Sequence, residues 1–179
     1  MSRVRRMIRA GLCGLVLLLC AGWLLPEGRH IPVEGADSGD WHPQTFWYSP
    51  WGRSGVHKGV DIFAAKGTPV RASSGGLVLY RGTLRRGGKV VLVLGPKWRL
   101  HYYAHLDQIV DSGVWLWAHE PVGTVGVSGN AAGKPPHLHY SLVSLLPLIW
   151  QVDASPQGWK KMFYLDPTRH FVPDDRAVM

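Results

Sequence analysis

The hydrophobic pattern of the chain starts with one long apolar block, AGLCGLVLLLCAGWLL, over residues 10–25. A basic stretch over residues 1–9, with four arginines and no acidic residue, precedes this block, and Pro26 ends it. This order predicts an export signal or an N-terminal membrane anchor, with the arginines left in the cytoplasm. The block is slightly shorter than the roughly 20 residues that cross a bilayer untilted. Because no A-x-A motif accompanies the small pair Ala21-Gly22, we expect an uncleaved anchor.

The next segment, residues 26–52, is rich in turn-forming residues and aromatic rings but has no hydrophobic period. We interpret it as an extended connector whose rings cover the edge of the domain that follows. Two alternatives stay open, in which the rings line a substrate groove or rest at the membrane interface. The rings belong to Trp41, Phe46, Trp47, Tyr48 and Trp51.

Beyond the connector, short apolar stretches return at regular intervals, each bounded by glycine or proline. Such stretches predict β-strands, and the near absence of a 3.6-residue period predicts very little helix. We therefore predict one all-β domain over residues 53–172, with a single helical turn near its end, and a tail over residues 173–179. The expected strands cover residues 76–82, 89–95, 98–106, 120–129 and 137–143.

Composition and charge narrow the classes of function. The formal net charge of +8 falls to about +4 (8 − 4) once the four leader arginines are set aside, and the remaining basic residues are interspersed with acidic ones. This distribution indicates a solvated basic surface or an affinity for an anionic polymer. No basic helix or aromatic RNA-binding signature accompanies the charge, which argues against nucleic acid. Both cysteines, Cys13 and Cys20, lie in the apolar block, so the exported domain has no disulfide.

Two histidines one residue apart, His137 and His139, lie in one of the predicted strands. Side chains at positions i and i+2 project from the same face of a strand, so the two imidazoles are neighbours. Leu138 points to the opposite face, where its burial in the core fixes the register of the pair. Such a pair is more often a polar surface feature than a site, and only partners from elsewhere in the chain make it a candidate site.

The stretch HKGVD supplies such partners, the imidazole of His57 and the carboxylate of Asp61. Four extended residues span about 13 Å, too far for both side chains to reach one ion at bond lengths near 2 Å, so we expect a bend at Gly59. These two groups and one imidazole of the HLH pair make a His₂Asp set with an open fourth position, as in catalytic zinc sites. His105 and the other HLH histidine would then transfer protons and stabilise an oxyanion.

Five stretches occur in the order HKGVD, GTPVRASSGGLV, YYAHL, GTVGVSGN and HLHYSL between about Arg53 and Leu142. This order resembles the lysostaphin/LytM-type zinc endopeptidases of bacterial cell walls, a likeness that extends to Asp166-Pro167 near the C-terminus. The resemblance implies a small antiparallel β-sandwich or barrel-like domain with the site in a groove on one sheet. It implies that Zn²⁺ is bound by His57, Asp61 and His139, and that His105 and His137 are the catalytic histidines that do not bind the metal.

The sequence departs from the family pattern at two places. The loop over residues 128–136 reads SGNAAGKPP, where the family often has a serine-threonine-glycine-proline run. The resemblance therefore does not imply which substrate the groove wall formed by this loop prefers. His101 stands where a threonine is common, and we expect it to be an exposed strand residue. Tyr103 shares a strand face with His101 and His105 by simple alternation. We assign Tyr103 and Asn130 to substrate binding, with packing as the alternative role of Tyr103.

The sequence therefore predicts a zinc endopeptidase that hydrolyses peptide cross-links of peptidoglycan during cell wall remodelling. We expect it to be anchored in the inner membrane with its domain in the periplasm. A stem cross-link from D-alanine to diaminopimelate is favoured over a glycine bridge if the host is Gram-negative. The oligomeric state does not follow from these residues.

Two alternative functions belong to other classes. One is a catalytically silent relative that regulates other wall hydrolases, but such relatives typically lack some zinc ligands, and all five key positions are occupied here. The other is a biotinyl or lipoyl carrier domain, which the glycine-valine rhythm of residues 67–79 and 120–129 resembles. A carrier domain needs a lysine exposed at a hairpin tip, which these stretches lack, and the export segment argues against a cytosolic carrier.

Overall fold

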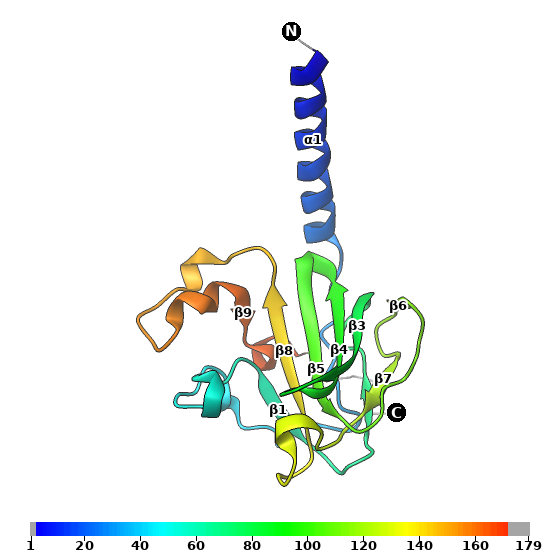
Figure 1. Cartoon of the computed structure of the whole chain (residues 1–179), viewed down its shortest axis with the longest axis vertical. Coiled ribbons are helices and arrows are strands. Elements are labelled where there is room, and N and C mark those ends of the chain that lie inside the picture. Colours follow the sequence, from blue (N-terminus) through cyan, green and yellow to red (C-terminus); the bar gives the residue numbers. More distant parts are fainter. Residues whose placement is uncertain (1–2, 172–179) are drawn as a thin grey trace.

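The computed structural model describes residues 3–171 and shows one long helix that stands on a β-sheet domain (Figure 1). The helix, α1 (Arg3–Leu24), has 22 residues, so it is about 33 Å long at 1.5 Å per residue. It begins within the basic stretch and includes residues 10–24 of the apolar block, which makes it longer than the block alone. By length and composition α1 can cross a membrane, although a signal sequence at the N-terminus would meet the same criterion.

The domain is almost entirely β-structure, as predicted, and all its strand pairs are antiparallel. The short 3-10 helices η1 to η7 connect the strands, and no α-helix besides α1 occurs within residues 3–171. The strands are β1 (Val60–Phe63), β2 (Pro69–Arg71), β3 (Gly76–Leu84), β4 (Gly88–Gly95), β5 (Arg99–Leu106), β6 (Trp115–Leu116), β7 (Pro121–Thr124), β8 (His137–Ser144) and β9 (Tyr164–Leu165).

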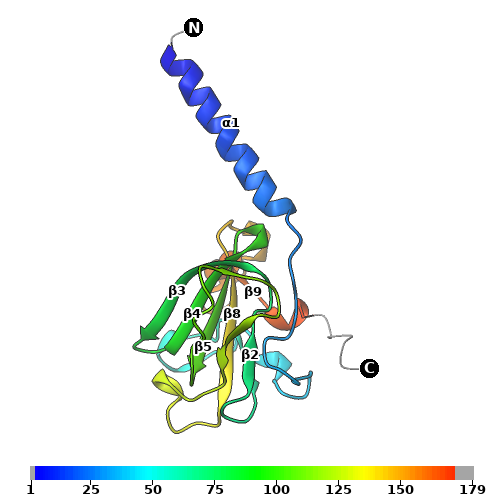
Figure 2. The ribbon, with the colours of Figure 1, turned by 90° about the vertical axis from the view of Figure 1, so that its right-hand side faces the viewer.

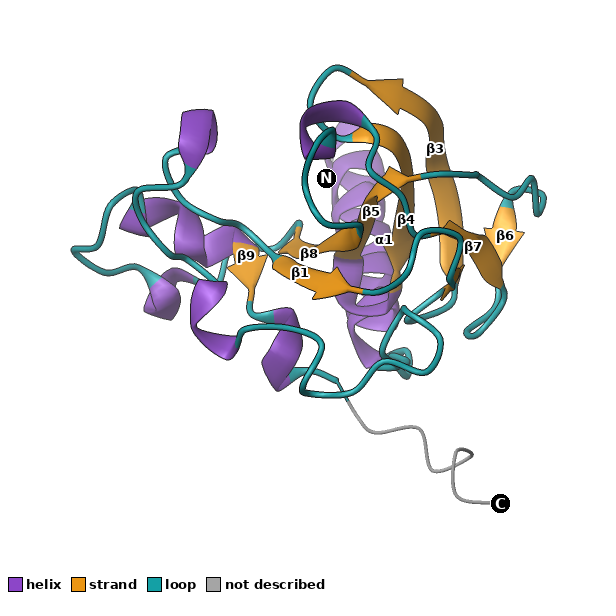
Figure 3. Cartoon of the chain, turned by 90° about the horizontal axis from the view of Figure 1, so that it is seen from below, coloured by secondary structure: helices purple, strands orange, loops and turns teal. Residues whose placement is uncertain are grey.

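Seven strands form one sheet in the order β1-β8-β5-β4-β3-β6, with β9 paired to β8 beyond the end of β1. The strands β2 and β7 form a second, two-stranded sheet. Figure 2 shows β2 beside the large sheet, and Figure 3 shows most of the short helices beyond its β1 and β9 edge. Both HLH histidines therefore lie on a strand that has neighbours on either side.

The main core lies between the two sheets. Its members are apolar side chains that alternate along the strands and lose nearly all contact with solvent, which is the dominant favourable contribution to folding. Leu138, between the two HLH histidines, is fully buried in this core, as the period-two pattern predicts. The buried core residues are Val33, Val60, Ile62, Val70, Ala72, Val91, Val93, Tyr103, Leu106, Leu116, Val122, Val125, Leu138 and Tyr140.

The connector runs along the domain and is bonded to it. Val33 is buried and pairs with Val70 of β2, and Glu27 forms an ion pair with Arg99 of β5 in which both side chains are almost fully buried. Trp47 is also buried, and its indole Nε1 donates to the carbonyl of Pro156, 3.0 Å away. The prediction that the rings of this segment cover the domain is confirmed for Trp47, whereas Tyr48 is exposed.

The predicted strands match β3, β4, β5 and β8 to within two residues at each end. The strand predicted over residues 120–129 is shorter in the structure, because β7 ends at Thr124. The chain then turns toward β8, and Gly126 forms a single β-bridge with His137. The short strands β2, β6 and β9 were not predicted. Each has only two or three residues, too few to show an alternating pattern.

Candidate metal centre

Two neighbouring strands bring the HKGVD and HLH stretches together. In the antiparallel pair of β1 and β8, Asp61 lies directly opposite His139, so both side chains project from the same face of the sheet. His57 reaches this face because the chain bends at Gly59, as the sequence predicts. An added Cβ at Gly59 would lie 2.4 Å from the carbonyl oxygen of Tyr140 in β8, so only glycine allows the backbone to pass so close.

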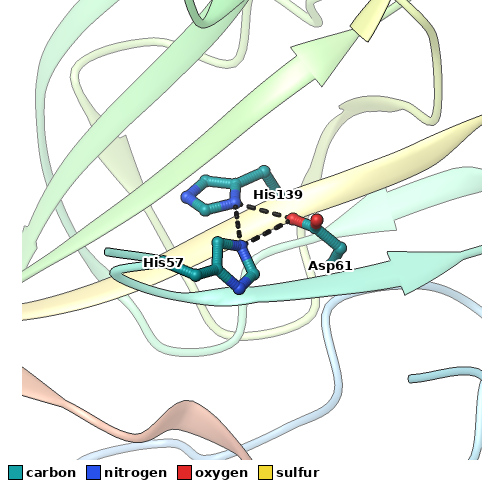
Figure 4. A group of neighbouring side chains, drawn as sticks. All are labelled: His57, Asp61 and His139. Atoms are coloured by element: carbon teal, nitrogen blue, oxygen red, sulfur yellow. Dashed lines mark hydrogen bonds and ion pairs between the residues drawn. The ribbon is translucent and has the colours of Figure 1, made fainter. Parts of the chain in front are cut away.

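Three potential ligand atoms converge on one point (Figure 4). His57 Nε2 lies 3.1 Å from Asp61 Oδ1 and 3.1 Å from His139 Nδ1, and His139 Nδ1 lies 2.7 Å from Asp61 Oδ1. Around an ion with tetrahedral bonds near 2.0–2.1 Å, ligand atoms are separated by about 3.3 Å. The observed triangle is therefore close to the size that one zinc ion requires.

The outer contacts of both imidazoles fix which nitrogen faces this point. His57 Nδ1–H donates to the carbonyl oxygen of Thr45 at 3.0 Å, which leaves Nε2 with a lone pair. His139 Nε2 lies 3.0 Å from Ser141 Oγ, so its Nδ1 can present a lone pair in the same way. Two lone pairs and a carboxylate oxygen that face one another would repel unless a cation lay between them, so the arrangement suits a metal ion. Partners of this kind commonly orient metal-binding histidines.

Electrostatics keep the carboxylate charged. With no ion bound, burial raises the pKa of the Asp61 carboxyl, but hydrogen bonds from protonated forms of His139 and His57 outweigh this effect and hold the pKa well below its ordinary value. A charged carboxylate is the form that binds a metal ion. Neutral imidazoles with one carboxylate oxygen, and no thiolate within reach, suit zinc better than calcium or magnesium.

The connector contributes one wall of the site. The indole of Trp51 stacks on the imidazole of His57, with ring centroids 4.3 Å apart and an interplanar angle of 24°. Backbone hydrogen bonds from Trp47 N to His57 O and from His57 N to Tyr48 O hold the same residue from both sides. His57 is consequently buried, whereas Asp61 and His139 are partly exposed. The three-residue group therefore opens to solvent on the side of Asp61 and His139.

Two further imidazoles lie beside the group. His105 Nδ1–H donates to the carbonyl oxygen of Ser128 at 2.9 Å, and His137 Nδ1–H donates to that of Pro135 at 2.8 Å. In both rings Nε2 is thus the nitrogen available to a substrate. The ring centroid of His105 lies 5.1 Å from that of His137 and 5.9 Å from that of His139. Burial, together with the charges of His139 and His137, lowers the pKa of His105 to about 4.

His105 reaches this face by an irregularity in β5. Its φ of 64° is left-handed, and the register of β5 against β4 shifts between the pairs Val91–Tyr103 and Lys89–Leu106. This β-bulge interrupts the alternation of side chains. His105 therefore projects beside His139, although simple alternation would place it with Tyr103 on the opposite face.

The prediction that Tyr103 binds substrate is not supported, because Tyr103 pairs with Tyr140 of β8 and so projects from the face opposite to that of His139. Tyr103 is fully buried in the core, where its hydroxyl accepts a hydrogen bond from Ser73 N at 3.0 Å. Its neighbour Tyr102 is partly exposed, and its ring meets that of His139 edge-on with centroids 6.4 Å apart. Tyr102 was not predicted as a site residue, because only its pairing with Ser141 shows that it shares a face with His139.

Two other predicted positions lie away from the three-residue group. His101, expected to be exposed, is buried on the core face, with Nδ1 2.7 Å from the hydroxyl of Tyr140. Asn130 is exposed in η4 (Gly129–Ala131), two residues beyond the Ser128 carbonyl that holds His105. Its proposed contact with substrate stays a prediction.

Comparison with known proteins gives a consistent set of relatives. A family model described as peptidase family M23 matches residues 55–146, about half of the chain. The chain is 35% identical over 144 residues to the L-Ala–D-Glu endopeptidase of Bacillus subtilis, a match that covers 70% of this chain and 42% of that protein. It is 30% identical over 103 residues to the peptidoglycan DD-endopeptidase ShyC of Vibrio cholerae, covering 57% of this chain and 22% of that protein. The chain thus spans less than half the length of these curated relatives.

Among solved structures, the catalytic domain of lysostaphin from Staphylococcus simulans is similar in fold. The two share 27% sequence identity with a TM-score of 0.52, and the match covers 69% of this chain and 87% of that domain. The matched family region, residues 55–146, includes β1 to β8 and hence the strands that carry the histidines, whereas α1 and β9 lie outside it.

Proposed function

Because the chain belongs to peptidase family M23, we propose that it is a zinc-dependent endopeptidase that hydrolyses peptide bonds in the cross-links of bacterial peptidoglycan. The observation that carries this proposal is the convergence of His57 Nε2, Asp61 Oδ1 and His139 Nδ1 on one point, with two more imidazoles beside it. Three ligands leave a fourth position free, which is the arrangement of catalytic zinc sites. A zinc ion bound there would supply the Lewis acidity that amide hydrolysis requires.

The two histidines outside the metal group have the chemistry of proton transfer and oxyanion stabilisation. Each ring is fixed by a hydrogen bond from Nδ1–H to a backbone carbonyl, so Nε2 faces the space beside His139 in a set orientation. His105, whose pKa is lowered to about 4, is neutral at pH 7 and can accept a proton at Nε2. Once protonated, the same nitrogen can donate a hydrogen bond to the oxyanion or return the proton to the leaving amine.

The substrate class follows from the relatives, and the scissile bond does not. The named relatives act on different bonds, L-Ala–D-Glu in one and a DD cross-link in another. For this chain we retain the D-alanine to diaminopimelate cross-link of a Gram-negative wall as the proposed substrate. Mass spectrometry of the fragments released from sacculi identifies the bond directly.

We also propose a role for each segment of the chain. Residues 10–25 form a signal or, as we favour, an uncleaved anchor in the inner membrane, with residues 1–9 on the cytoplasmic side. Residues 26–52 connect the anchor to a peptidase domain over residues 53–172 in the periplasm. The proposed tail, residues 173–179, lies outside the described residues.

The test uses the full chain in detergent, loaded with one equivalent of zinc and incubated with isolated sacculi. New free amines should appear in proportion to the amount of protein, and His57→Ala should abolish their release. The variant Asp111→Ala is the control, because the Asp111 side chain is 95% exposed and lies outside the metal group, and its activity should equal that of the original chain.

A silent regulator of other wall hydrolases would behave differently. It would release no amines from sacculi of any source and with any metal, while a retained fold and retained zinc would show that the protein itself is intact. That combination of results would overturn the proposed activity.

A further inference from the structure

The end of α1 is docked on the domain. Trp98, at the end of η3 (Pro96–Trp98) in the β4–β5 turn, donates a hydrogen bond from its indole Nε1 to the carbonyl of Leu19 at 3.0 Å. The same ring lies against Gly22, where an added Cβ would come within 2.4 Å of an indole carbon. The absence of a side chain at Gly22 thus lets the helix and the turn approach closely, and the contact identifies the β4–β5 turn as the part of the domain next to α1.

A second segment meets the same turn. Leu145, the first residue after β8, donates its backbone N–H to the carbonyl of Trp98 at 2.9 Å. The segment that follows exposes large apolar side chains, above all Ile149 and Trp150, whose exposed fractions are 69% and 74%. We call Leu145, Ile149, Trp150 and Val152 the 145–152 patch. All four side chains are exposed, and they occur within one short stretch of chain.

The patch is presented by a fixed scaffold. Leu148, between its members, is buried in a small apolar cluster with Leu142 of β8 and Leu165 of β9. The backbone N–H of Leu148 also donates to the carbonyl of Met162 at 2.7 Å. The exposed side chains therefore point outward because the opposite side of the segment is anchored in the domain.

The position of the patch relative to α1 is visible in two views. Figures 1 and 2 share a vertical axis, and in both the segment that follows β8 lies at the end of the domain from which α1 extends. The turn that contains η4 lies at the opposite end in Figure 1. A bilayer entered by α1 would therefore face the 145–152 patch and not η4.

Chemistry favours a membrane surface as the partner. Trp, Leu and Ile side chains on a rigid surface are the groups that enter the boundary between lipid headgroups and acyl chains. Lysines occur in two segments close to the patch, Lys97 in η3 and Lys160 in η6 (Gly158–Phe163), and their charge suits anionic headgroups. The acidic residue that follows the patch, Asp153, is paired with Lys161. The ammonium of Lys160 lies 5.4 Å from the ring centroid of Trp159, another exposed side chain of the same region.

We propose that the 145–152 patch inserts into the outer interfacial layer of the membrane that α1 enters, so that the domain rests on the bilayer in one orientation. This inference relies on α1 being retained as an anchor and does not depend on catalysis. Together, α1 and the patch give the domain two separate points of attachment, and one of them is a protein surface with no assigned role in hydrolysis.

The test uses the full chain with Cys13→Ser and Cys20→Ser, reconstituted in nanodiscs that contain phosphatidylcholine and phosphatidylglycerol. An environment-sensitive fluorophore is attached at Ile149→Cys, and the matched control carries it at Ala132→Cys, an exposed position in the turn at the opposite end of the domain. We expect the label at position 149 to shift to shorter emission wavelengths and to lose intensity when lipids with a nitroxide near the headgroup replace ordinary lipids. The label at position 132 should show neither change.

Equal emission from the two positions, with and without nitroxide lipid, would overturn the proposal. A shift at position 149 that nitroxide lipid does not quench would assign the patch to contact between copies of the chain, and would also overturn it. A second label at Val152→Cys guards against a local disturbance at position 149, because it must report the same quenching. The readout needs no hydrolysis, so its failure leaves the proposed enzymatic activity untouched.

Discussion

His139 Nδ1 lies 2.7 Å from Asp61 Oδ1, although the two residues are 78 positions apart in the sequence. Their contact results from the antiparallel register of β1 and β8, in which the two residues are direct partners. A cation bound to both would link the two strands through their side chains. Metal binding and the pairing of β1 with β8 should therefore depend on each other.

Replacing Asp61 tests the shared ion directly. In Asp61→Ala the two imidazoles remain, but the charged ligand is lost, so we expect zinc affinity to fall by at least about 100-fold. The measurement is zinc content by mass spectrometry after dialysis against a competing chelator. Asp107→Ala is the control, since Asp107 is a partly exposed carboxylate outside the group and should leave zinc content unchanged. Equal zinc content in the original chain and Asp61→Ala would rule out this carboxylate as a ligand.

The two non-ligand histidines should affect turnover and leave the metal in place. We expect His105→Ala and His137→Ala to lower kcat by about 10²- to 10⁴-fold, the usual range for a lost general acid or base. Zinc content should stay at one equivalent in both variants, which separates them from Asp61→Ala. If either variant lost its zinc, the residue would have to be reassigned as a ligand or as a support of one.

Gly59 allows the bend that brings His57 to the site. In Gly59→Ala the new Cβ would lie 2.4 Å from the Tyr140 carbonyl oxygen and 3.0 Å from His139 Cε1, so β1 has to move away from β8. We expect a loss of about 1–3 kcal/mol in the free energy of unfolding, as for other overpacked positions, together with weaker zinc binding. Urea unfolding with and without zinc measures both effects. Gly39→Ala, in an exposed turn, should change neither quantity appreciably.

The buried histidine on the core face predicts a dependence of stability on pH. Burial, with smaller effects from Arg99 and His170, lowers the pKa of His101 to about 3 in the folded chain, against about 6.5 when unfolded. Between these values the unfolded state binds a proton that the folded state does not. Stability is therefore complete above about pH 6.5 and decreases as the pH falls, by about 1.4 kcal/mol per pH unit for this one group.

Urea unfolding of the metal-free chain at pH 7, 6 and 5 measures this slope. In His101→Gln an amide takes the place of the imidazole beside Tyr140, and the slope should decrease by the equivalent of one proton. Some slope remains in this variant, because partial burial also lowers the pKa of His170 to about 4, so that His170 contributes in the same direction. An identical slope in the two proteins would mean that His101 is not neutral when buried.

Much of the fold was predictable, because its determinants are local. Periodic apolar stretches located β3, β4, β5 and β8, and the separation of His57 from Asp61 required a bend that the structure places at Gly59. What could not be predicted depends on pairing between distant segments. Tyr102 shares a face with His139 because it pairs with Ser141 of β8. His105 reaches that face through a bulge, and no pattern within β5 itself signals its left-handed backbone.

The supporting contacts of the site were equally hidden in the sequence. His57 is oriented by the carbonyl oxygen of Thr45, and a backbone carbonyl is available at every residue, so it leaves no trace in the sequence. Trp51 was recognised as one of several aromatic residues, but its stack on His57 was not. Both contacts come from the connector, which sequence patterns alone describe only as irregular.

The buried ion pair of Glu27 and Arg99 limits how far the domain can move away from α1. Glu27 lies three residues beyond the end of α1, and its ion pair with Arg99 of β5 means that the segment after the helix is not a flexible linker. If α1 remains in the bilayer, the proposed catalytic site is held at a fixed distance from the lipid. The proposed activity would then reach only wall strands at that distance from the membrane. Parts of the sacculus farther from the membrane would not be cut.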